Sequence, residues 1–208
     1  MKITDIEQLS KGLCKLYLDG NYHCTVYYET VVSEGYRIGD IVQQEDIDDL
    51  VYKSDLKRGY ERALYLIEYR PHSVKELYDK LKKNYPEQVC NYIVNKLINA
   101  GLLNDKEYAG MLVRNMVNFK KYGTGRIKSE LMRKGIDKYI IEDVLCEETE
   151  EDTEYNNLVD IIRKKYITKL SYGKELERTV NALVRKGYKF SDIRAAVREL
   201  SDTEILED

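Results

Sequence analysis

The stretch KKYGTGRIKSELMRKGI, residues 120–136, carries the pattern from which the fold is predicted. Its two glycines among basic residues suggest a phosphate-binding loop. Such a loop ends in Gly-Lys-Ser/Thr, however, and a dinucleotide fingerprint has a third glycine after a strand. Here Ile127 and Leu131 lie four residues apart, Thr124 is a suitable N-cap, and Gly135 is a typical helix end. The stretch therefore predicts a short amphipathic helix and not a nucleotide site.

The same helix pattern recurs along the chain. Counting from Gly135 or Gly187, apolar residues follow at +6, +9 and +10 in both places. The anchor leucines Leu81, Leu131 and Leu183 are separated by 50 and 52 residues. A unit of this kind buries its apolar face only by stacking on its neighbours. We therefore predict a mainly α protein of tandem three-helix repeats in an elongated, curved body.

The predicted helix ends have local causes. Gly135 and Gly187 each follow a lysine, and we expect both in the left-handed conformation that glycine adopts without steric cost. Ser73 and Glu76 have the spacing of a capping box, and Asn104 has the position of an N-cap.

Only residues 13–42 show strand patterns. LCKLYLDGNYHCTVYY, residues 13–28, predicts a β-hairpin that turns at Asp19-Gly20-Asn21, and a short strand is expected at Ile41–Val42. Residues 45–54 follow as a short helix or linker. The predicted division of the chain is a small N-terminal β-rich region at 1–55, repeats at 56–104, 105–150 and 151–200, and an acidic tail at 201–208.

The composition gives no indication of an enzyme or a membrane protein. No apolar run approaches the roughly 20 residues of a membrane span, and the N-terminus has no signal-peptide core, so we expect a cytoplasmic protein. The four cysteines form no CxxC pair and are expected to be free thiols, with no metal bound. Because the sequence has two distant histidines and no nucleophile motif, we predict no catalytic residues and no cofactor.

Charge is segregated along the chain, although the net charge is only −3. Residues 120–138 have a net charge of +5, and residues 147–154 contain six acidic residues and no basic one. Such runs are often a solvated face, yet alternating patches also suit docking to a charged polymer. On the helix before Gly187, the apolar residues Leu176, Val180 and Leu183 are expected in the core. The basic residues Lys174, Arg178 and Arg185 share the opposite face of that helix, and Arg126 and Arg133 share a face of theirs away from Ile127 and Leu131. The predicted partner contacts are Lys120, Lys121, Arg126, Lys128, Arg133, Lys174, Arg178 and Arg185.

Three segments together resemble the RecX family of RecA regulators. They are YRPHSVKELYDKL (69–81), INAGLLNDKEYA (98–109) and the stretch 120–136, and the similarity extends over about residues 57–200. His72 departs from the family pattern, which has a basic residue there, so a positive charge at this position is in doubt at neutral pH.

The resemblance implies a non-enzymatic modulator that binds the RecA–DNA filament as a monomer and inhibits the ATPase and strand-exchange activities of RecA. DNA within the filament is a further expected partner. Two alternatives stay open from the residues themselves. One is a helical module that binds nucleic acid directly through Arg126, Lys128 and Arg133, and the other is a helical scaffold without a polymer partner.

Overall fold

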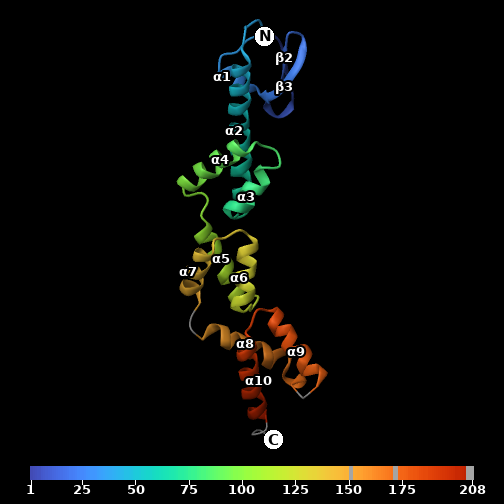
Figure 1. Ribbon diagram of the computed structural model, residues 1–208, viewed down its shortest axis with the longest axis vertical. Coiled ribbons are helices and arrows are strands. Elements are labelled where there is room, and N and C mark those ends of the chain that lie inside the picture. Colours follow the sequence, from blue (N-terminus) through green and yellow to red (C-terminus); the bar gives the residue numbers. More distant parts are fainter. Residues whose placement is uncertain (150–151, 171–172, 205–208) are drawn as a thin grey trace. The chain divides into compact units, whose positions relative to one another are not determined.

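A small antiparallel sheet forms the N-terminal part of the computed structural model, which describes residues 1–149, 152–170 and 173–204 (Figure 1). Its strands, in the order β1-β2-β3, are β1 (Ile3–Gln8), β2 (Leu13–Leu18) and β3 (Asn21–Tyr27), with a short 3-10 turn at Ser10–Gly12. The strands β2 and β3 form the predicted hairpin, and the alternating apolar residues of β2 are buried on one face of the sheet. The β-hairpin prediction is therefore confirmed.

Two predictions about the sheet were wrong. The strand β1 was missed because most of its side chains are polar and exposed, and only Ile3 is fully buried, as is usual for an edge strand. The expected strand at Ile41–Val42 is a single bridge between Lys2 and Ile41. A short helix, α1 (Tyr28–Ser33), follows the sheet and was not predicted.

The expected short helix or linker at 45–54 is part of one long helix, α2 (Gln44–Tyr69). Its first half packs on the sheet, where the Tyr27 backbone N–H donates to Ser54 Oγ at 2.7 Å. Its second half packs on α4, and a Cβ at Gly59 would lie 2.6 Å from Ile93 Cδ1. Because the two halves bury different faces, α2 lacks a continuous apolar stripe, and the sequence suggested a break.

The rest of the described chain is helical. The helices after α2 are α3 (Val74–Leu81), α4 (Glu87–Asn99), α5 (Asp105–Asn118), α6 (Thr124–Arg133), α7 (Lys138–Glu148), α8 (Thr153–Lys165), α9 (Lys174–Arg185) and α10 (Phe190–Glu204), with a 3-10 turn at Ile167–Lys169. The helices α2–α4, α5–α7 and α8–α10 are the three predicted repeats. The anchor leucines Leu81, Leu131 and Leu183 are all fully buried, which confirms the repeat pattern.

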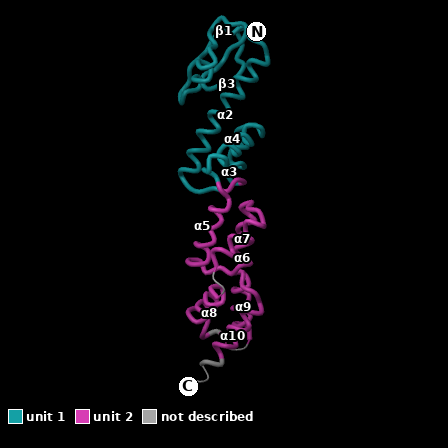
Figure 2. Tube along the Cα trace, turned by 90° about the vertical axis from the view of Figure 1, so that its left-hand side faces the viewer, with its two compact units in different colours: residues 1–72, 76–103 teal, residues 73–75, 104–208 magenta. Residues whose placement is uncertain are grey.

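The chain divides into two compact units, coloured separately in Figure 2. Unit 1 holds residues 1–72 and 76–103, and unit 2 holds residues 73–75 and 104–208. In unit 1 the sheet forms a core with α1 and the start of α2. Unit 2 contains one core in α5–α7 and another in α8–α10.

The predicted domain limits and the elongated, curved arrangement of the repeats stay proposals. The predicted limit between residues 55 and 56 falls inside α2, so the first repeat and the sheet share a helix. Of the predicted acidic tail, residues 201–204 belong to α10, and residues 205–208 lie outside the described part of the chain.

Most predicted helix ends are confirmed. Gly135 and Gly187 have φ of +80° and +97°, the left-handed conformation expected after a helix. The Asn104 side chain accepts hydrogen bonds from the Lys106 and Glu107 N–H groups, as an N-cap does. Thr124, however, is the first residue of α6, and the N-cap is Gly123.

Candidate partner-binding surface

The glycine that ends the second helix of a repeat also contacts the segment that begins another second helix. In unit 2, Ser73 Oγ donates to the Lys134 carbonyl at 2.6 Å, next to Gly135. In the same way, the Gly123 N–H donates to the Lys186 carbonyl at 2.9 Å, next to Gly187. The Lys186-Gly187 pair is therefore a docking point between the last two repeats as well as a helix end.

Backbone meets backbone at the second of these junctions. The Gly125 N–H donates to the Gly187 carbonyl at 3.1 Å, and a Cβ at Gly123 would lie 2.5 Å from the carbonyl carbon of Gly187. Gly123 has an ordinary φ of −74°, so the reason for glycine there is space and not backbone conformation. The two glycines of the stretch 120–136 allow this close approach.

The N-terminus of α6 has no free N–H groups to form a phosphate cradle. The Glu154 carboxylate accepts from the Thr124 N–H at 2.9 Å and also from the Thr124 hydroxyl. The next two N–H groups, of Gly125 and Arg126, donate to carbonyl groups of the protein. A carboxylate at a helix N-terminus is favourable for the helix dipole. The rejection of a nucleotide-binding loop therefore also has a structural basis.

Three cations surround a single aromatic ring at this junction. The ammonium groups of Lys120 and Lys186 lie 5.8 and 5.3 Å from the centroid of the Tyr122 ring, and the Arg126 guanidinium lies 5.7 Å from it. We call these four residues the Tyr122 cluster. Cation–π attraction holds such groups at a ring face. Lys120 and Lys186 have no carboxylate partner among the residues that the structure describes, so the cluster is a site of concentrated positive charge.

Lys186 is the member of the cluster that sequence analysis missed. Its ammonium donates to the Lys120 carbonyl at 3.2 Å. Burial, and after it the charge of Lys165, lowers the pKa of Lys186. In the sequence, Lys186 is the residue before a helix-ending glycine, and only the tertiary approach of the two repeats brings it to Tyr122.

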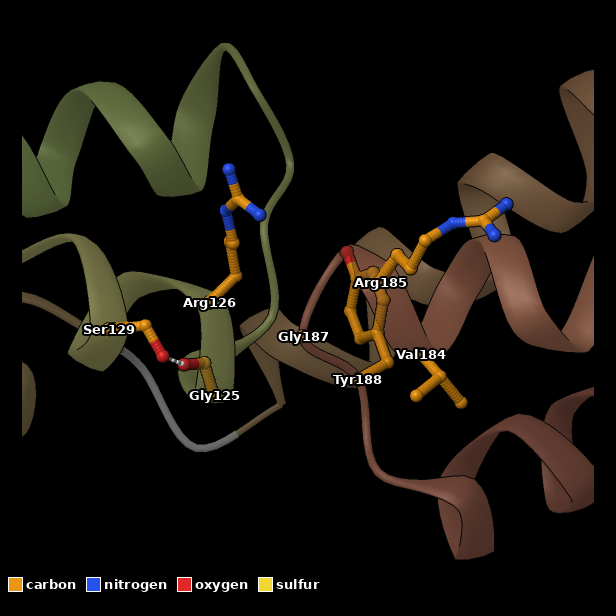
Figure 3. A pocket seen from close by; sticks show the side chains of 7 residues that line it. All are labelled: Gly125, Arg126, Ser129, Val184, Arg185, Gly187 and Tyr188. Atoms are coloured by element: carbon orange, nitrogen blue, oxygen red, sulfur yellow. Dashed lines mark hydrogen bonds between the residues drawn. The ribbon is translucent and has the colours of Figure 1, made fainter.

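A hollow of about 400 Å³ lies beside the cluster. Figure 3 shows Arg126 of α6 on one side of it and Arg185 and Tyr188 on the other. Tyr188 is buried, and its hydroxyl donates to the Lys121 carbonyl at 2.9 Å. The predicted contacts Arg126 and Arg185, which are distant in sequence, thus line the same hollow.

Three of the predicted contacts on or near α6 have ionic partners within the protein. Lys121 donates to Asp160 at 2.7 Å, and this contact holds the pKa of the Asp160 carboxyl below its usual range. Arg126 and Arg133 both pair with Glu130, as their shared helix face implies. Lys128 is half-buried and forms no ion pair with another described residue. This face carries less uncompensated charge than the sequence suggested.

All three predicted contacts on α9 are exposed: Lys174, Arg178 and Arg185. On the opposite side of the helix, Leu183 is fully buried, as predicted. Leu176 and Val180 are half-buried and pack against the same core. The buried residue between them is Thr179. The helix therefore presents a basic side to solvent, in agreement with its sequence pattern.

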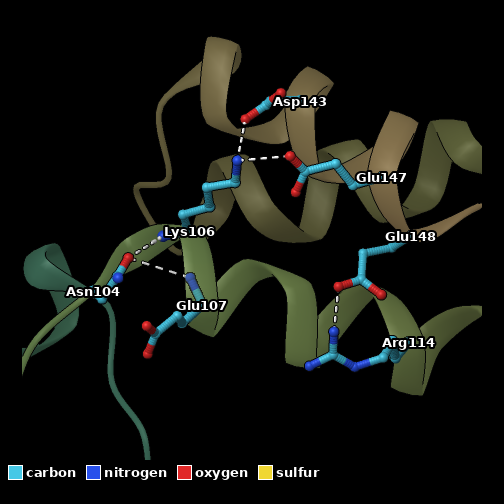
Figure 4. Close-up of polar contacts among 7 residues, drawn as sticks. All are labelled: Asn104, Lys106, Glu107, Arg114, Asp143, Glu147 and Glu148. Atoms are coloured by element: carbon cyan, nitrogen blue, oxygen red, sulfur yellow. Dashed lines mark hydrogen bonds and ion pairs between the residues drawn. The ribbon is translucent and has the colours of Figure 1, made fainter.

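Part of the acidic run 147–154 is occupied by contacts inside unit 2, two of which are drawn in Figure 4. Lys106 donates to Asp143 at 2.6 Å and to Glu147 at 2.8 Å, and Arg114 pairs with Glu148. Glu154, near the start of α8, accepts from Thr124, so three of the six acidic residues of the run have partners inside unit 2. Residues 150 and 151 of the run lie outside the described part of the chain.

His72 does not supply the positive charge that the family pattern has at this position. Its ring is buried, its Nδ1 lies 2.8 Å from the Arg70 carbonyl oxygen, and its Nε2 has no partner in the described structure. Burial lowers the pKa of His72, so the ring is neutral at pH 7.

The described residues contain no cluster of side chains for metal binding. No group of three or more histidine, cysteine or acidic residues within them could hold a metal ion, and the four cysteines are free. Among the same residues, no helix has the length and apolar character to cross a membrane. A set of helical repeats with a cationic junction is instead the kind of structure found in binding proteins.

The comparisons with known proteins agree with this class. Residues 60–97 match the first three-helix domain of RecX, and residues 104–145 match the second. The regulatory protein RecX of Clostridioides difficile (strain 630) is 25% identical over 202 residues, which are 95% of both chains.

Two solved structures are also similar. One is the crystal structure of a regulatory protein RecX, with a TM-score of 0.66 and 26% identity over 93% of this chain and 98% of that one. The other is RecX from Lactobacillus salivarius, with a TM-score of 0.63 and 34% identity over 71% of this chain and 97% of that one.

The chain belongs to the RecX family of regulatory proteins. This membership confirms the resemblance drawn from the three sequence segments, and it confirms that the chain is a regulator and not an enzyme.

Proposed function

We propose that this protein binds the RecA–DNA filament and inhibits ATP hydrolysis and strand exchange by RecA. The observation that carries the proposal is membership of a family of regulatory proteins over nearly the whole chain. The tandem repeats support the proposal. Repeats at intervals of about 50 residues present similar surfaces more than once along the chain, and a filament presents the same surface on each protomer, so successive repeats can bind successive protomers.

We infer that the Tyr122 cluster and the basic side of α9 face the anionic parts of the filament. Lys120, Arg126 and Lys186 concentrate positive charge within 6 Å of one ring centroid. A nucleic-acid strand of a duplex carries one phosphate about every 3.4 Å along the axis, so several cations close together suit it. The exposed residues Lys174, Arg178 and Arg185 would extend this contact.

The second candidate function is direct binding of nucleic acid without RecA. The Tyr122 cluster is the observation that favours it, because cations and an aromatic ring together bind single strands in many proteins. The pairing of Arg126 and Arg133 with Glu130 weakens it, since both belong to the proposed phosphate contacts. The net charge of −3 also gives little general attraction to DNA.

Sedimentation of the protein with three ligands separates the two functions. At about 150 mM salt, we expect the protein to pellet with RecA assembled on single-stranded DNA. At the same salt concentration, we expect most of the protein to stay in solution with DNA alone or with RecA alone. Equal binding to bare DNA, with strong salt dependence, would instead support the direct nucleic-acid module.

The remaining features of the proposal follow from the partner. RecA acts on DNA, so we propose that the protein works in the cytoplasm. We also propose that it acts as a monomer, because tandem repeats within one chain supply several docking surfaces without a second copy.

A further inference from the structure

Two aromatic side chains occupy equivalent positions in the first two repeats, and both are highly exposed. Tyr69, the last residue of α2, is 80% exposed, and Phe119, which follows α5, is 83% exposed. Each lies five residues before the first residue of the next helix, Val74 or Thr124. The two positions are thus separated by 50 residues, the spacing of the anchor leucines Leu81 and Leu131.

Each of these aromatic residues is followed by a cation. Arg70 follows Tyr69, and Lys120 follows Phe119. The Arg70 guanidinium lies 3.6 Å from a Glu76 oxygen with its side chain 43% exposed, so it is accessible from solvent. In the third repeat, the residue five positions before α9 is Lys169, so the aromatic–basic pair is confined to the first two repeats.

Packing does not explain the two aromatic residues. A side chain that is four-fifths exposed contributes little to the core, and each helix ends without help from the ring, since the chain turns at Pro71 or enters the left-handed region at Lys121. Isolated exposed aromatic residues are common on proteins. The same pair at the same position in two repeats, however, indicates a common use.

We propose that Tyr69 and Phe119 are matching anchors that insert into equivalent pockets on successive protomers of the RecA filament. The pocket would have an apolar floor for the ring, and the adjacent Arg70 or Lys120 favours an acidic rim. Aromatic residues that enter a pocket commonly dominate the energy of an interface. This inference rests on the proposed function. It adds contacts with RecA itself to the contacts with phosphate groups proposed above.

The test uses the full chain with Tyr69→Ser, Phe119→Ser, and both together. The readout is the concentration of protein that halves DNA-dependent ATP hydrolysis by RecA. Each single substitution is expected to raise this concentration at least about tenfold, and the double substitution is expected to raise it further. Thermal melting should be unchanged in all three variants, because neither ring is buried.

Tyr139→Ser is the matched control. Tyr139 is also exposed, at 69%, and its ring centroid lies 4.7 Å from the ammonium of the preceding Lys138. Unlike the two anchors, however, it lies in the first turn of the third helix of its repeat. Its substitution is expected to change the inhibitory concentration by less than about twofold.

Unchanged inhibition by the folded double variant would overturn the inference, and so would a loss confined to one of the two anchors. Failure of the unsubstituted protein to inhibit RecA would overturn the proposed function itself. The two failures are distinguishable, because the second appears before any substitution is made.

Discussion

Replacing Gly187 by valine is expected to lower the free energy of unfolding by about 3 kcal/mol or more. Gly187 has φ of +97°, which costs a residue with a Cβ roughly 1–2 kcal/mol. The new Cβ would also overlap the backbone nitrogen of Arg126 and lie 2.7 Å from the Gly123 carbonyl oxygen. These are backbone atoms of the neighbouring repeat, so the repeats must separate to make room. Urea denaturation of the full chain measures the change.

Gly101→Val is the matched control for this prediction. Gly101 follows α4 with φ of +69°, but no atom lies within 4 Å of the position where its Cβ would be. The backbone strain alone should cost about 1–2 kcal/mol there. Gly135 is intermediate, since a Cβ at that position would overlap the flexible side chain of Lys75. Equal losses at Gly101 and Gly187 would contradict the role of Gly187 in docking the repeats.

Reversing Arg126, Arg133, Arg178 and Arg185 to glutamate is expected to weaken filament binding at least about 100-fold near 100 mM salt. All four side chains are exposed, so the fold should persist. Two of the changes place carboxylates beside Glu130 on α6, and such repulsion between helix neighbours costs less than about 1 kcal/mol. The salt dependence of binding should decrease, because fewer counterions are released.

A second quadruple variant controls for total charge. The four reversals replace four positive charges by four negative ones, so the formal net charge changes from −3 to −11. The change of Lys80, Lys82, Lys83 and Lys138 to glutamate gives the same net charge at exposed positions outside the Tyr122 cluster and α9. If both variants bind the filament equally well, the interface lies elsewhere on the protein.

Local pattern was enough to predict most of the helical part of the fold. The anchors Leu81, Leu131 and Leu183 are buried, and the left-handed glycines end the expected helices. These features depend on residues that are close in sequence, where helical periodicity and glycine conformation act directly. The edge strand β1 and the continuity of α2 were missed, because each depends on contacts with distant segments that the local pattern does not contain.

The candidate surface was less predictable than the fold. Arg126 and Arg185 were expected contacts, and they line one hollow. The charges on Lys121 and Arg133, in contrast, are compensated by Asp160 and Glu130. Lys186 joins the Tyr122 cluster only through the approach of two repeats. A count of charges along the sequence therefore could not separate paired cations from unpaired ones.

The central claim is that this chain inhibits the RecA filament, and the most direct test is the rate of DNA-dependent ATP hydrolysis by RecA in the presence of the purified protein. The account predicts that the rate falls as the protein is added to preformed filaments. It also predicts that the Arg126, Arg133, Arg178 and Arg185 variant requires much more protein for the same effect. An unchanged or increased rate of hydrolysis, with protein that is folded and present in excess over RecA, would contradict the claim.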